Sequence, residues 1–66
     1  MENKFELAKT TDNIEEINKL SIDQDEDVRY FVAQNLNTPI SVLEKLSDDE
    51  SKFVRCQALK NLNSRK

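Results

Sequence analysis

The sequence predicts an all-α fold, a short α-solenoid of about two and a half helical repeats of 26 residues each. The chain of 66 residues contains no glycine and a single proline, which disfavours hairpins and most sheet folds. It also matches itself at an offset of 26 residues, since KLSIDQDEDVR at 19–29 lies over KLSDDESKFVR at 45–55. The tripeptide NLN recurs with the same offset, at 35–37 and 61–63. A period in this range is typical of stacked helical units that bury their apolar faces against one another.

The period divides residues 1–66, a single domain, into a degenerate N-terminal capping helix at 1–11 and two repeats at 12–37 and 38–63. In the N-terminal segment Glu2 and Asn3 take the places that Val28 and Arg29 occupy one repeat later. This end is therefore expected to be polar, as the terminal units of a solenoid usually are.

The first helix of each repeat is predicted from a capping signal and an apolar stripe. Asp12 with Glu15 is typical of a capping box, and Thr38 before Pro39 is typical of an N-cap followed by proline at the first helical position. A spacing of three then separates the apolar residues, which are Ile14, Ile17 and Leu20 in one repeat and Ile40, Leu43 and Leu46 in the next. This spacing fits a short α-helix or a 3₁₀ segment, and both stay open.

The second helix of each repeat carries an apolar stripe with an arginine at its edge. The stripes consist of Val28, Val32 and Leu36, and of Val54, Ala58 and Leu62. Arg29 and Arg55 lie at the border of the buried face, where an unpaired charge is costly. Asp23 and Asp49 each precede an arginine by six residues. Because a guanidinium group suits a carboxylate and loop carbonyls at once, we expect these four residues to form a structural ladder between units.

Stacking should also align exposed side chains of the second helices into two rows. One row contains Lys4, Tyr30 and Cys56, and its neighbour contains Ala8, Gln34 and Lys60. We expect this face to bind another protein. Tyr30 is the expected anchor, because exposed aromatic residues are over-represented at interaction hot spots.

The last helix keeps its apolar positions, although no further unit follows it in the sequence. Phe53, Leu59 and Leu62 are therefore expected to form an open C-terminal edge. Solenoids usually carry a polar cap at such an edge. We expect a second copy of the chain, giving a homodimer, or the partner to cover it.

These residues resemble the leucine-rich repeat variant family, a HEAT-like helical solenoid whose unit reads approximately V-R-x-x-V-A-x-N-P-x-T-P-x-x-V-L-x-x-L-x-x-D. The matching positions are Val28, Arg29, Val32, Ala33, Asn35, Thr38, Pro39, Val42, Leu43, Leu46 and Asp49. The resemblance covers residues 12–63, with Leu36 in place of the usual proline and Ser64 and Arg65 in place of the second Thr-Pro. It implies a scaffold for a partner and no reaction. Some relatives carry an iron–sulfur segment, but the single Cys56 cannot supply such a cluster, so no cofactor is implied.

The composition disfavours catalysis and metal binding. The chain has no histidine, which is the usual general base and the commonest metal ligand. The D-x-D-x-D pattern at 23–27 lacks the glycine and the glutamate of a calcium loop, so we interpret these acids as helix caps. One cysteine, no secretory signal and no apolar run of membrane-spanning length predict a soluble cytoplasmic protein with no membrane association.

The charge distribution leaves two other functions open. Residues 1–27 hold nine acids and three lysines, a net of −6, and residues 28–66 hold four acids and seven bases, a net of +3, which together give −3. The acidic half would suit a small inhibitor or regulator of a nucleic-acid-binding enzyme. The basic C-terminal helix would suit nucleic acid itself, through Lys52, Lys60, Arg65 and Lys66. A helix-turn-helix interpretation is disfavoured, because the outward residues of 39–47 hold no arginine and are net negative.

Overall fold

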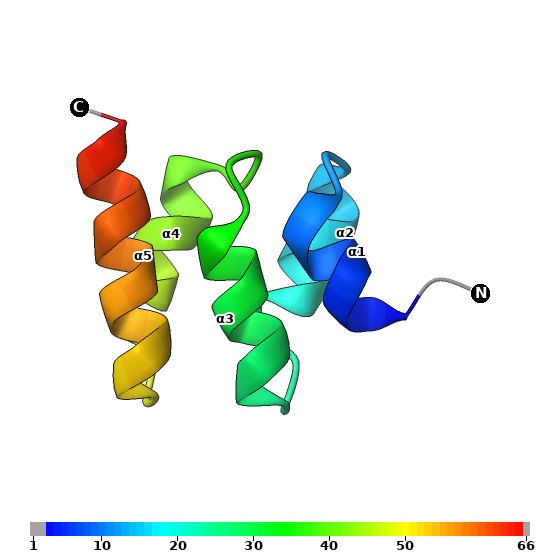
Figure 1. Ribbon diagram of the computed structural model, residues 1–66, viewed down its shortest axis with the longest axis horizontal. Helices are drawn as coiled ribbons and strands as arrows, with labels where there is room; N and C mark the ends of the chain where they lie inside the picture. Colours follow the sequence, from blue (N-terminus) through cyan, green and yellow to red (C-terminus); the bar gives the residue numbers. More distant parts are fainter. Residues whose placement is uncertain (1–2, 66) are drawn as a thin grey trace.

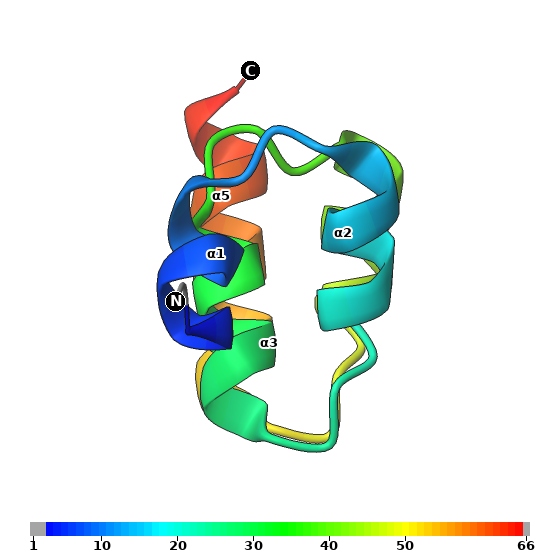
Figure 2. The same ribbon diagram turned by 90° about the vertical axis from the view of Figure 1, so that its right-hand side faces the viewer.

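The computed structural model describes residues 3–65, which fold into α-helices joined by short turns, with no strand in that range. The helices are α1 (Lys4–Thr10), α2 (Ile14–Leu20), α3 (Glu26–Gln34), α4 (Ile40–Leu46) and α5 (Lys52–Ser64). Helices α1, α3 and α5 stand side by side in one layer, and α2 and α4 form a second layer (Figure 1 and Figure 2). The all-α prediction is confirmed, and the first helices of the predicted repeats are α-helical rather than 3₁₀ over the described residues.

Helix α2 begins one residue later than its predicted cap. Asn13 is the N-cap, and its side-chain oxygen accepts hydrogen bonds from the backbone N–H groups of Glu15 (3.0 Å) and Glu16 (3.3 Å). Asp12 is exposed, so the predicted capping box is wrong. Two good capping residues stand next to each other here, and the asparagine satisfies the otherwise unpaired donors of the first turn.

Helix α4 also differs from its prediction at the start. Pro39 is the N-cap and makes no side-chain capping bond, so the N-cap predicted at Thr38 is wrong. The hydroxyl of Thr38 is fully buried and donates instead to the carbonyl oxygen of Val32 (2.7 Å). This bond satisfies a carbonyl in the last turn of α3 and leaves the hydroxyl itself paired.

The core lies between the two layers and is built mainly from small and branched aliphatic side chains. Its buried members are Ala8, Ile17, Leu20, Val28, Val32, Ala33, Val42, Leu43, Leu46, Val54 and Ala58. Helix α3 lies at the centre and packs against both α1 and α5. At the edge of the core the rings of Phe5 and Phe31 meet edge to face with centroids 6.2 Å apart, which joins α1 to α3.

Helix α3 is shorter than its apolar stripe predicts. It ends at Gln34, and Leu36 is 78% exposed, so the prediction that Leu36 continues the buried stripe is wrong. The reason is Asn35, which is buried in the turn and whose Oδ1 accepts a hydrogen bond from the backbone N–H of Asn37 (2.8 Å). In α5, which continues to Ser64, the corresponding Leu62 packs against the core.

Candidate protein-interaction surface

Arg29 holds together the turns before α3 and before α5. Its Nη1 donates to the carbonyl oxygens of Asp23 (2.7 Å) and Gln24 (3.2 Å). Its Nε and Nη2 donate to the two carboxylate oxygens of Asp49 (2.8 and 3.2 Å), and the two side chains are only 10% and 9% exposed. The bond with the Asp49 carboxylate raises the pKa of Arg29 above 12.5, so the guanidinium stays charged. The expected carboxylate partner is thus supplied by the following turn, while Asp23 supplies a carbonyl.

Arg55 reproduces half of this arrangement. Its Nη1 donates to the carbonyl oxygens of Asp49 (2.8 Å) and Glu50 (3.2 Å), as Arg29 does one turn earlier in the chain. Among residues 3–65, no acceptor lies within hydrogen-bonding distance of its Nε and Nη2. The guanidinium is therefore oriented by two carbonyls, and the edge that binds a carboxylate in Arg29 stays open in Arg55.

The carboxylate of Asp23 lies in the same kind of turn as that of Asp49. Its Oδ1 accepts from the backbone N–H of Asp25 (2.9 Å), and its Oδ2 accepts from Nζ of Lys4 (3.4 Å). The hydrogen bond from Asp25 is the main cause that lowers the pKa of Asp23, with Lys4 adding to it and burial opposing it. Lys4, predicted to belong to the partner-binding face, thus contacts the ladder instead.

Two buried asparagines form a second ladder, which the sequence reasoning missed. Nδ2 of Asn35 donates to the carbonyl oxygens of Ala8 (3.1 Å) and Thr11 (2.8 Å), at the end of α1. Nδ2 of Asn61 donates to those of Ala33 (2.9 Å) and Asn35 (3.1 Å), at the end of α3. The repeated NLN tripeptide was the available signal.

Arg65 also acts within the fold. Its Nε donates to Oδ1 of Asn61 (3.0 Å), and its Nη1 and Nη2 donate to the carbonyl oxygens of Thr38 and Leu36. Arg65 was predicted as part of a basic nucleic-acid-binding helix, and its donors are now used by the chain itself. Lys52 and Lys60 are exposed, and Lys66 lies outside the described residues.

Tyr30 is half-buried rather than fully exposed. Its ring meets that of Phe31 edge to face at 5.6 Å. It also lines a hollow of about 240 Å³ between α3 and α5, together with Glu26, Asp27 and Phe53. The structure thus brings Tyr30 to Phe53.

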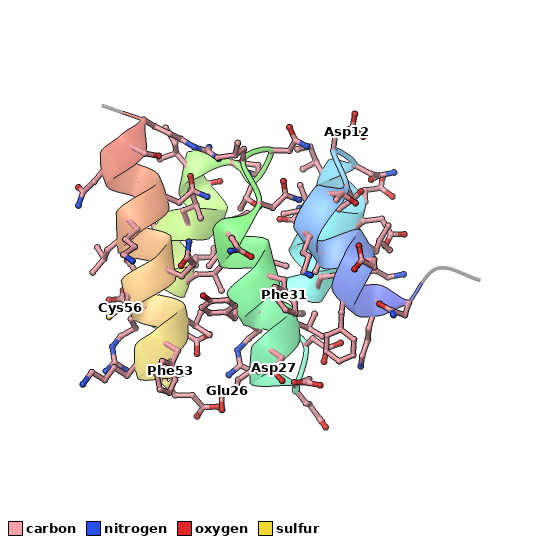
Figure 3. The ribbon with its side chains drawn as sticks, in the orientation of Figure 1. Asp12, Glu26, Asp27, Phe31, Phe53 and Cys56 are labelled. Carbon is pink, nitrogen blue, oxygen red and sulfur yellow. The ribbon has the colours of Figure 1, made fainter. Side chains whose placement is uncertain are left out.

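The remaining members of the two predicted rows lie in different surroundings. Figure 3 shows Cys56 on the side of α5 that faces away from α3. Gln34, Cys56 and Lys60 are exposed, as expected of a binding face. Ala8 is fully buried, so its placement in an exposed row is wrong. Residues 26 positions apart point the same way from successive helices, so the side that α5 covers on α3 is bare on α5.

The predicted C-terminal edge is partly exposed. Phe53 is 70% and Leu59 49% exposed, whereas Leu62 packs against the core. A groove of about 350 Å³ runs between α4 and α5 here, lined by Ile40, Glu44, Leu59, Leu62, Asn63 and Arg65.

The acidic segment at 23–27 stabilises turns. Asp25 is the N-cap of α3 and accepts from the N–H of Asp27 (2.9 Å), while the Glu26 carboxylate accepts from the hydroxyl of Ser51 (2.6 Å). Within residues 3–65 no three acidic or cysteine side chains gather as metal ligands would. In the same range, no helix combines the length and the apolar character needed to cross a membrane.

A scan against protein-family models found no match, and searches of curated proteins and of solved structures found no significantly similar protein. The functional argument therefore starts from the geometry of the described residues.

Proposed function

We propose that this protein is a non-enzymatic helical-repeat module, an α-solenoid of the leucine-rich repeat variant type, that binds another protein. The observation that supports it is the recurrence of one polar arrangement after 26 residues. Arg29 donates to two carbonyl oxygens at 2.7 and 3.2 Å, and Arg55 to two at 2.8 and 3.2 Å. Asp23 and Asp49 each accept from the N–H two residues ahead, at 2.9 Å in both turns. Stacked units of this kind serve as scaffolds for partners.

A protein partner is supported by the surface around Tyr30. The hollow between α3 and α5 joins two aromatic side chains, Tyr30 and Phe53, to the carboxylates of Glu26 and Asp27. Aromatic residues surrounded by polar ones are characteristic of the buried centre of a protein interface. In this proposal Tyr30 and Phe53 anchor the partner, and the exposed Gln34 belongs to the polar rim.

The partner is identified by affinity capture of the tagged protein from its native host, with and without nuclease, read by mass spectrometry. The affinity of the purified partner is then measured by calorimetry for Tyr30→Ala and for the control Ile22→Ala, which removes an 81% exposed apolar side chain in another turn. We expect Tyr30→Ala to weaken binding at least about tenfold, as for a hot-spot residue, and Ile22→Ala to have no effect.

Two results would contradict the proposal. Unchanged affinity of Tyr30→Ala would show that the partner does not use this hollow. Recovery that disappears with nuclease would indicate nucleic-acid binding through the exposed Lys52 and Lys60.

The inhibitor hypothesis can be separated with one further variant. Asp27 is exposed, and its carboxylate accepts no hydrogen bond within residues 3–65, unlike Asp25 and Glu26. Asp27→Lys therefore reverses a charge without removing a cap. An acidic mimic should lose most of its affinity, because its attraction to a basic groove is electrostatic. An aromatic interface should change little in affinity and mainly in association rate.

A further inference from the structure

Equivalent faces of α3 and α5 differ in what covers them. Arg29 and Ala33 lie one turn apart on α3 and are buried beneath α4 and α5. Their counterparts 26 residues later, Arg55 and Leu59, are partly and half exposed. The side of α5 that corresponds to the covered side of α3 therefore offers a guanidinium next to an apolar stripe.

The cover on α3 shows what such a face accepts. It consists of α4, which packs its apolar side against α3, and of the turn after α4, whose Asp49 binds Nε and Nη2 of Arg29. In Arg55 the same two nitrogens are unoccupied among residues 3–65, and Nη1 is already held by carbonyls. The face is thus organised in advance for a bidentate carboxylate, which is the strong geometry for arginine.

We propose that this face of α5, formed by Arg55, Leu59 and Leu62, is a docking site for an amphipathic helix of the partner protein that is followed by an aspartate-bearing turn. The aspartate carboxylate accepts from Nε and Nη2 of Arg55, and the apolar side of the helix covers Leu59 and Leu62. This inference rests on the proposed function and specifies the chemistry of the partner.

Charge favours an acidic partner over a second copy of the chain. Helix α5 contains Lys52, Arg55 and Lys60 and no acidic residue. In a second copy the two aspartates in turns of the required kind are already bound, Asp49 by Arg29 and Asp23 by Lys4. A second copy would have to break one of these contacts to supply the carboxylate.

The test uses a probe taken from the chain itself. A peptide of residues 38–50, TPISVLEKLSDDE, acetylated and amidated, contains the sequence that covers α3. It is titrated into the isotope-labelled protein and followed by the amide signals and the arginine Nε–H signals in NMR. Concentrations on the order of millimolar are needed, because isolated helices this short are marginal in water.

We expect shifts at Leu59, Leu62 and the Nε–H of Arg55. An otherwise identical peptide with Asp49→Asn should bind about tenfold more weakly, because a charge-assisted bidentate contact is lost. On the protein side, Arg55→Gln should weaken binding similarly and the charge-matched control Lys19→Gln should not. If Arg55→Gln fails to fold, the peptide pair still decides the question, since it leaves the protein unchanged.

Several outcomes would overturn the inference. Absence of shifts on α5, or equal binding of the two peptides, would remove the carboxylate site. Shifts confined to Arg29 and Ala33 would mean that the peptide displaces α4. Self-association of the protein alone through Leu59, detected by sedimentation, would assign the face to a second copy. None of these results affects Tyr30-dependent partner binding, so the failure of this inference is distinguishable from the failure of the proposed function.

Discussion

Truncation of the two arginines to alanine tests how much the carboxylate contact contributes to stability. Arg29→Ala and Arg55→Ala remove the same side chain from equivalent positions, and each removes two bonds to turn carbonyls. Only Arg29→Ala also removes the bidentate contact with Asp49. Arg55→Ala is therefore a matched control for everything except that contact.

The magnitudes follow from burial. For Arg55, which is half-buried, we expect a loss in the free energy of unfolding of about 1 kcal/mol, the net value of ordinary hydrogen bonds. Breaking a buried ion pair costs about 3–5 kcal/mol, because the remaining charge is left unpaired. Asp49 keeps the bond from the N–H of Ser51 (2.9 Å), which favours the lower value. Arg29→Ala should therefore lose about 4 kcal/mol, roughly the whole stability that a core of this size supplies.

The assay is urea denaturation followed by far-UV circular dichroism. Arg55→Ala should shift the midpoint modestly with the slope unchanged, whereas Arg29→Ala should be largely unfolded without denaturant. Asp49→Asn is a milder variant that keeps an acceptor and removes the charge, and it should fall between the two. Equal midpoints for Arg29→Ala and Arg55→Ala would refute the reasoning, because the Asp49 contact would then contribute nothing.

Two further perturbations probe the core and the acid dependence. Leu46→Ala, at a side chain only 3% exposed, should cost about 2–5 kcal/mol, and Leu59→Ala, at one 49% exposed, clearly less; equal losses in thermal midpoint would contradict the assigned core. The folded-state pKa of Asp23 is lowered from 3.8, so its contribution is complete above that pH and is lost as the pH falls through the lower folded value. Asp23→Asn should therefore reduce the loss of stability below pH 3.8 relative to Asp12→Asn at an exposed site, and parallel acid curves for the two variants would count against the role of Asp23.

Much of the fold was accessible from the sequence, because helix propensity and the 26-residue match both act locally. The buried stripe over Val28 and Val32 and the expectation of a partner for Arg29 follow from helical periodicity alone. The identity of that partner does not, since the carboxylates of Asp23 and Asp49 are both near in the repeat. Only the stacking of turns places the second one 2.8 Å from Nε of Arg29.

The misjudged features depend on contacts between distant segments. The apolar pattern continues through Leu36, and nothing local ends α3 at Gln34. The end is set by Asn35, which is buried because its amide reaches carbonyls at the end of α1, 24 and 27 residues earlier. The burial of Tyr30 likewise depends on α5 standing beside α3. Ring orientation on one helix cannot be converted to exposure until the neighbouring helix is placed.

The absence of glycine explains why side chains from later in the chain complete the helix ends. None of the described residues has a positive φ, so no helix among them ends in the left-handed cap that glycine usually supplies. Instead the last carbonyls of α1 accept from Asn35, and those of α3 accept from Asn61, each on the next helix of the same layer. Each unit is therefore stabilised by its successor, which couples stability along the array. By the same logic, a partner that binds Arg55 should stabilise α5 as Asp49 stabilises α3, and its binding should raise the unfolding midpoint of the whole protein.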